Sequence, residues 1–188
     1  GITGVTASNL NAINDVLASA AVDGAAADTP AELQAIVNAY NKVLSAANGT
    51  DGDAAATATA ADYASLGVTS VSAATAALLS DVIDGKAATD VDTVAELQTL
   101  ANAVRQVLGY VDPVLNAANA PTAEQSNALT GALVAGSTVS PVTPDNLALV
   151  LAALAAANGD GTLVNAQSEL QTLVVDALAA YTAALATI

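Results

Sequence analysis

Five residue types are absent from this 188-residue sequence: Cys, His, Met, Phe and Trp. Without Cys the chain can form no disulfide and has no thiol nucleophile, and without Cys and His it lacks the usual zinc ligands. Without His, a serine-type triad has no base. The core must therefore be built from Ala, Val, Leu and Ile, whose small side chains exclude water only where elements approach closely.

Basic residues are nearly absent as well. Three Lys and Arg stand against 18 Asp and Glu, a net charge of −15, which repels nucleic acid and anionic membrane surfaces. The longest apolar run, residues 147–157, is shorter than the roughly 18 residues of a membrane-spanning helix. We therefore expect neither nucleic-acid binding nor membrane insertion. We expect Lys42 on a polar helix face, Lys86 in a loop and Arg105 opposite an apolar stripe, all solvated.

The most informative feature of the sequence is an internal repeat. The tripeptide Glu-Leu-Gln occurs at 32–34, 96–98 and 169–171. The first two copies follow a Thr three positions before the Glu, the arrangement of a capping box at a helix start. Thr59 with Asp62, and Thr122 with Gln125, repeat that signal. We expect a helix to begin at each of these places.

Two further elements recur in the sequence, on the N-terminal side of the Glu-Leu-Gln copies. A middle element precedes each copy, and a short element precedes the last two middle elements. Their ranges are 5–10, 71–76 and 142–147 for the middle element, and 59–66 and 122–129 for the short one. Each repeat unit is thus predicted to contain a short, a middle and a long helix.

Apolar residues recur at helical spacing in the long and middle elements. We expect these stripes to face the core. In the long elements they are Leu33, Ile36, Val37, Tyr40 and Leu44; Leu97, Leu100, Ala101, Val104 and Leu108; and Leu170, Leu173, Val174, Ala177, Tyr181 and Leu185. In the middle elements they are Leu10, Ile13, Val16 and Leu17; Leu78, Leu79, Val82 and Ile83; and Leu147, Val150, Leu151 and Leu154.

The predicted fold class is all-α, with about eight helices in a tandem array of three-helix repeat units. The units span residues 1–50, 51–118 and 119–188, and the first lacks its short helix. A unit without one helix leaves an apolar groove. Either the sequence has been cut between repeats of a longer protein, or a helix of a neighbouring copy fills the groove.

Three loops are rich in glycine and in the oxygen ligands that calcium prefers. The candidate ligands are Asn48, Asp51, Asp53, Asp84, Asp90, Asp92 and Asp160. None of the loops is an EF-hand, because the twelfth position counted from Asn48 is Thr59 rather than Glu. Asn-Gly and Asp-Gly pairs also make ordinary turns between helices. Calcium binding and simple turn formation both remain open, and we expect no other cofactor.

Four segments, 2–10, 61–69, 67–72 and 92–98, look like tandem repeats found in very large bacterial surface and secreted proteins. Such proteins resemble adhesins and surface-layer or extracellular-matrix components. The resemblance covers nearly the whole chain and weakens over 116–167. It implies an extracellular, non-catalytic role, and it assigns no functional residues.

The function that we expect is a non-catalytic structural or adhesive module, acting as a spacer or as a subunit of a cell-surface or filamentous assembly. Self-association, or contact with neighbouring repeats of the same chain, follows from that role. The alternative is a ligand-binding or calcium-binding helical module of a secreted adhesin. Glycoside cleavage by paired carboxylates is disfavoured, because the chain offers few aromatic platforms for a sugar.

Overall fold

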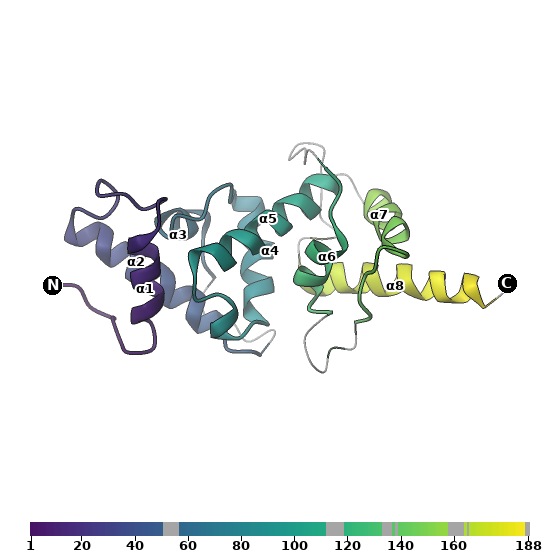
Figure 1. The fold of residues 1–188 in the computed structure, drawn as a ribbon, viewed down its shortest axis with the longest axis horizontal. Helices are drawn as coiled ribbons and strands as arrows, with labels where there is room; N and C mark the ends of the chain where they lie inside the picture. Colours follow the sequence, from purple (N-terminus) through teal and green to yellow (C-terminus); the bar gives the residue numbers. More distant parts are fainter. Residues whose placement is uncertain are drawn as a thin grey trace. The chain divides into compact units, whose positions relative to one another are not determined.

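The computed structural model describes residues 1–50, 57–111, 119–132, 137, 139–157, 164 and 166–186. Within these ranges the protein is all-helical, with eight α-helices, one short 3-10 helix and no strand, which confirms the predicted fold class (Figure 1). The helices are α1 (Leu10–Ala18), α2 (Pro30–Ala46), α3 (Ala60–Ser65), α4 (Ala73–Asp84), η1 (Ala88–Asp90), α5 (Val94–Val111), α6 (Ala123–Thr130), α7 (Leu147–Ala156) and α8 (Gln167–Leu185).

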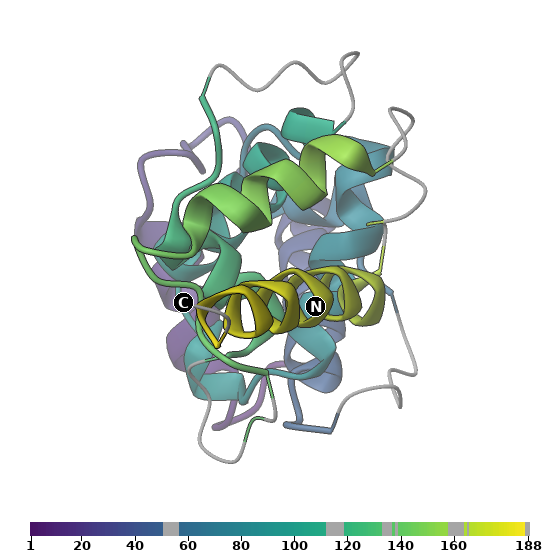
Figure 2. The same cartoon turned by 90° about the vertical axis from the view of Figure 1, so that its right-hand side faces the viewer.

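The chain forms two compact units, an N-terminal unit of Gly1–Ala101 and a C-terminal unit of Asn102–Ile188. In the N-terminal unit, α2 contacts α1, α3 and α4. In the C-terminal unit, α8 contacts α6 and α7, and Figure 2 shows α7 (green) running beside α8 (yellow). The division falls within α5 rather than at the expected boundaries of 1–50, 51–118 and 119–188, so the tandem array of three units stays a prediction.

Helix starts follow the capping-box signals in the sequence. At α2, the Glu32 amide donates to Thr29 Oγ1 (3.2 Å) and the Thr29 amide donates to Glu32 Oε2 (3.0 Å). The same reciprocal pair forms at the three other predicted starts. It also forms at α4, where no capping box was predicted. The pairs are Thr59 with Asp62, Thr93 with Glu96, Thr122 with Gln125, and Ser72 with Thr75.

The third long helix, α8, keeps only half of this cap. Glu169 Oε2 accepts from the Ala166 amide at 3.1 Å, but Ala166 has no side-chain oxygen to return the bond. An Ala at the N-cap costs about 1 kcal/mol relative to Ser or Thr. The Glu-Leu-Gln copy that lacks a Thr three positions before its Glu therefore has the weakest helix start of the three copies.

The predicted apolar stripes are mostly buried. All five stripe residues of α5 are buried, whereas Leu33 and Leu44 of α2 are only half-buried. The prediction is wrong for Leu10 and Leu17 of α1, which are 44% and 39% exposed, and for Leu185 of α8, which is 53% exposed. Helix α1 buries Ala12, Ile13 and Val16, which form a narrower face than the sequence pattern suggested.

Close approach of backbone segments compensates for the small side chains of the core. Gly67 follows α3 with a φ of +76°, and a Cβ placed on it would lie 2.8 Å from the Cβ of Ala21. Only glycine fits there without strain, because both the left-handed backbone and the short contact exclude a side chain. This position joins the end of α3 to the segment between α1 and α2.

The most apolar helix, α7, is short and partly exposed. It covers only Leu147–Ala156, about 15 Å at the rise of an α-helix, against the roughly 30 Å of a bilayer core. Leu149 on its surface is 41% exposed. None of the helices within the described ranges is both long and apolar enough to span a membrane.

Removing a fully buried leucine tests this packing. Leu79→Ala in α4 should lower the free energy of unfolding by about 2–5 kcal/mol, because it opens a cavity in a core of small side chains. Leu10→Ala in α1 should change it by less than about 1 kcal/mol, since Leu10 is exposed. Denaturant unfolding followed by circular dichroism measures both, and equal losses would contradict the assigned faces.

Candidate functional site

The loop that contains the first group of predicted calcium ligands begins with Asn48. Its side chain is exposed, and its Oδ1 accepts from the Thr50 amide at 2.8 Å. The loop is joined to the segment after α4 by a bridge between Asn48 and Ala87, in which the Gly49 amide donates to the Lys86 carbonyl (2.9 Å). The candidates Asp51, Asp53 and Asp160 lie outside the described residues.

The remaining candidates occupy three different environments. Asp84 is buried at the end of α4, Asp90 is exposed and accepts from the Ala87 amide (3.2 Å), and Asp92 is half-buried before α5. In the part of the chain that the structure describes, no three carboxylates are grouped so that they could hold a metal ion. Calcium binding therefore stays a prediction, which depends on loops only partly described.

Acidic side chains gather where α5 begins. Asp15 of α1 accepts a hydrogen bond from the Val94 amide through Oδ2, at 2.7 Å. This contact satisfies one of the unpaired amides at the helix N-terminus and places a negative charge at its positive end. Partial burial, with the neighbouring Glu96 and Asp15, raises the pKa of Asp92. The cluster thus ties α1 to the start of α5.

Tyr40 lies under the same helix start and is fully buried. Its hydroxyl donates to the Val91 carbonyl at 3.0 Å. Burial, together with the negative charges of Asp15, Asp92 and Glu96, raises the pKa of this phenol. A phenol held protonated and committed to a backbone carbonyl acts as a structural donor rather than as an acid in a reaction.

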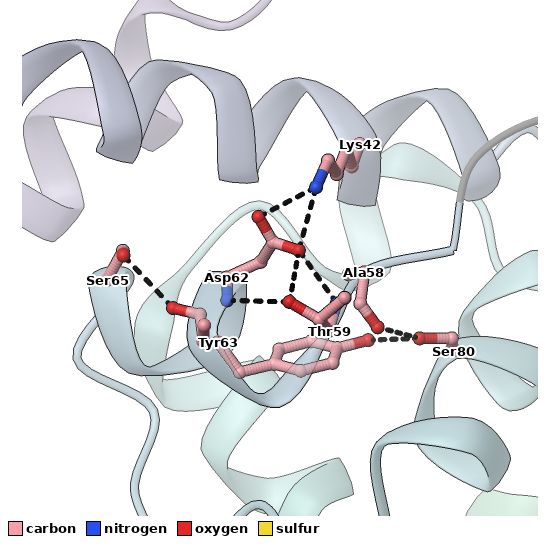
Figure 3. Close-up of polar contacts among 8 residues, drawn as sticks. Lys42, Ala58, Thr59, Asp62, Tyr63, Ser65 and Ser80 are labelled. Carbon is pink, nitrogen blue, oxygen red and sulfur yellow. Dashed lines mark hydrogen bonds and ion pairs between the residues drawn. The ribbon is translucent and has the colours of Figure 1, made fainter. Parts of the chain in front are cut away.

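Lys42 is ion-paired, contrary to the expectation that it is solvated. Its Nζ lies 2.8 Å from both carboxylate oxygens of Asp62, and the two side chains are 38% and 16% exposed (Figure 3). Burial by itself raises the pKa of Asp62, but hydrogen bonds from Lys42 and Thr59 outweigh it and leave the pKa lowered. The same carboxylate therefore caps α3 and binds α3 to α2.

A second polar contact, also drawn in Figure 3, joins α3 to α4. Ser80 Oγ donates its one proton to the Ala58 carbonyl (2.9 Å). The buried Tyr63 hydroxyl lies 3.0 Å from Ser80 Oγ and is therefore the donor in the bond between the two hydroxyl groups. Burial raises the pKa of Tyr63 to about 12. Because the proton of Ser80 is engaged by a carbonyl rather than by a base, this arrangement does not activate a nucleophile.

Lys86 is in a loop, as expected, but it is half-buried rather than solvated. Burial lowers the pKa of its ammonium group, and the nearby Asp90 carboxylate partly offsets that effect. Arg105 is exposed, in agreement with the sequence analysis. Of the three basic residues, only Arg105 thus has the solvated environment that the sequence analysis expected for all of them.

A glutamine clamp recurs in two of the three long helices that carry Glu-Leu-Gln. Gln34 Oε1 accepts from the Thr3 amide (2.9 Å) while its Nε2 donates to the Thr3 carbonyl (3.0 Å). Gln98 and Thr69 make the same pair of bonds, at 2.8 and 3.3 Å. Each clamped Thr is followed by a residue with left-handed backbone, Gly4 (φ 82°) or Ser70 (φ 63°). The segment entering each middle helix is therefore held in one shape by one side chain.

The third copy departs from this arrangement. Gln171 Nε2 donates to the Thr130 carbonyl instead, at 3.0 Å. The position that aligns with Gly4 is Pro141, whose ring fixes φ near −65° and prevents the left-handed turn. A neighbouring contact is preserved. Asn146 Oδ1 accepts a hydrogen bond from the Thr143 amide, and at the equivalent position Asn9 Oδ1 accepts one from the Thr6 amide. The local geometry is thus partly preserved.

Comparison with known proteins gives no match. No protein-family model fits the sequence, and neither a curated protein nor a solved structure is significantly similar to the chain. The function must therefore be argued from the arrangement of the residues themselves.

The Lys42–Asp62 pair should contribute to stability in a pH-dependent way. Lys42→Met should lower the free energy of unfolding at neutral pH by about 1 kcal/mol or less, because both groups are partly solvated. The pKa of Asp62 is lower in the folded protein than its unfolded value of about 3.9. The pair therefore stabilises the fold fully at pH values above the unfolded pKa, and this stabilisation is lost as the pH falls through the folded pKa. The difference between wild type and variant should shrink in acid.

Arg105→Met is the matched control for this experiment, since it also removes one positive charge but from an exposed side chain. Urea titrations of the three proteins at several pH values give the comparison. A loss that is the same for both variants, or that does not depend on pH, would contradict the pairing.

The glutamine clamps should act locally. Gln34→Ala should speed amide exchange at Thr3 roughly fivefold, the equivalent of about 1 kcal/mol for a lost hydrogen bond, and leave Thr69 unchanged. Gln98→Ala should do the reverse. Hydrogen exchange followed by NMR reads both amides, and each variant serves as the control for the other.

Proposed function

We propose that this protein is a non-catalytic structural module of the bacterial cell exterior, a spacer or building block in which similar helical units follow one another. The observation that carries the proposal is the recurrence of the glutamine clamp at Gln34 and Gln98, with the same two bonds to a threonine backbone. Side chains that could bind a ligand are used instead to hold the same backbone turn twice.

The polar contacts of the N-terminal unit support the same interpretation. The ion pair of Lys42, the hydroxyl of Tyr63 and that of Tyr40 each join one helix to another element. These contacts make each helix position depend on its neighbours. That is the property required of a unit that transmits force or holds a fixed spacing.

Composition and charge favour a place outside the cell. Without Cys and Met, the chain has no sulfur to oxidise, and a net charge of −15 keeps an alanine-rich surface soluble. The resemblance of its segments to repeats of large bacterial surface and secreted proteins points the same way.

Immunogold labelling of intact source cells tests the proposal. Antibodies raised against the purified chain should label the outside of cells that have not been permeabilised, or material shed from them. A deletion strain should lose the label, and an antibody against a cytoplasmic marker should label only permeabilised cells. Label that appears only after permeabilisation would refute the proposed location.

A further inference from the structure

Helix α1 exposes the residues that α4 buries. Residues 5–10 align with 71–76, so Leu10 occupies the place of Ala76 and Leu17 the place of Ile83. Leu10 is 44% exposed and Leu17 is 39% exposed, whereas Ala76 is 5% and Ile83 is 1% exposed. Helix α4 buries this face in the N-terminal unit, where it contacts α2 and α3. The matching face of α1 is open and carries two leucines.

Helix α8 shows the converse relation to α2. The alignment of Glu-Leu-Gln at 32–34 with that at 169–171 places Asp176 at the position of Ala39 and Ala180 at that of Val43. Ala39 is 0% and Val43 is 1% exposed on α2, which packs against α3 and α4. Asp176 and Ala180 are exposed. The face of α2 that is buried therefore corresponds to an open face on α8.

A groove of about 440 Å³ marks this open face. Two of its lining residues, Leu173 and Ala177, align with Ile36 and Tyr40, which are both fully covered on α2. The complete lining is Ala153, Glu169, Thr172, Leu173, Asp176 and Ala177.

The two open faces thus correspond to buried faces of α2 and α4, two helices that contact each other within one chain. We infer that α8 of one copy binds α1 of a second copy of this chain, so that copies associate head to tail. The occupant is a second copy because α1 presents leucines where α4 presents its buried face. The inference rests on the proposed structural function and names the partner of that module. Such a contact is heterologous, because it joins two different surfaces of the chain.

Two features make the contact weaker than its internal counterpart. Asp176 introduces a carboxylate where α2 has an alanine, and burying it requires a donor such as the Asn14 amide, which stands where α4 has Ser80. In addition, each copy carries a net charge of −15 and repels the next. Added salt screens that repulsion. Association should therefore rise with both protein and salt concentration.

Light scattering of the purified chain tests the inference. The mean mass of the wild type should increase with concentration, and more steeply in high salt, in steps of one chain. Leu17→Asp blocks the face of α1 and Ala180→Asp blocks that of α8, so each variant alone should remain a monomer. A mixture of the two retains one intact face of each kind and should form a pair of twice the chain mass, and nothing larger.

Matched controls place the same charge beside each face. Asn11→Asp on α1 and Val175→Asp on α8 alter exposed residues whose aligned positions, Ala77 and Asn38, are exposed as well. Both controls should associate as the wild type does. Circular dichroism checks that all variants are folded. Asn14→Glu replaces Leu17→Asp if the latter unfolds, because Asn14 is exposed on the same face.

A wild type that stays monomeric at all protein and salt concentrations overturns the inference. So does a single-face variant that associates as the wild type does, a mixture that stays monomeric, or a control that fails to associate. None of these results bears on cell-surface labelling, which tests the proposed function separately. Conversely, cells labelled only inside would refute the function and leave the head-to-tail contact standing.

Discussion

The reciprocal bonds between Thr29 and Glu32 fix where α2 starts, and the start of a helix fixes which of its faces turns inward. This matters more here than in most helical proteins. In an alanine-rich chain, a helix shifted by one residue would present a similar surface of small side chains. Comparable caps at α3, α4, α5 and α6 set the register of four more helices. The packing of Tyr40, Leu79 and the other buried residues depends on that register.

The caps were predictable because a cap is local, with both partners three residues apart in the sequence. The ion pair of Lys42 was not, because its partner Asp62 lies 20 residues away on another helix. Asp62 carried a recognisable signal as a cap residue, and nothing in the sequence indicated that its carboxylate also binds a lysine. The hydrogen bond between the Tyr63 hydroxyl and Ser80 could not be predicted for the same reason, because the two residues belong to different helices.

The exposed leucines of α1 show another limit of sequence patterns. A stripe such as Leu10, Ile13, Val16 and Leu17 indicates that a face is apolar, but it does not show how much of the face has a partner in the same chain. The calcium candidates were ambiguous for a chemical reason, because the oxygens that bind a cation also stabilise a turn. Asn48 illustrates this, since its side-chain oxygen accepts from the backbone of its own loop.

Two features recur in the chain, the glutamine clamp and the apolar helix faces, and they act over different distances. The clamp of Gln34 on Thr3 shapes the entry to a middle helix, and it is repeated almost bond for bond by Gln98 on Thr69. The apolar faces join one long helix to the helices that follow it, as α2 joins α3 and α4. Both features diverge in the C-terminal unit, where Pro141 replaces the left-handed turn and Asp176 replaces a buried alanine. Asp176 is exposed on α8, whereas a carboxylate at the position of Ala39 on α2 would be buried without a partner.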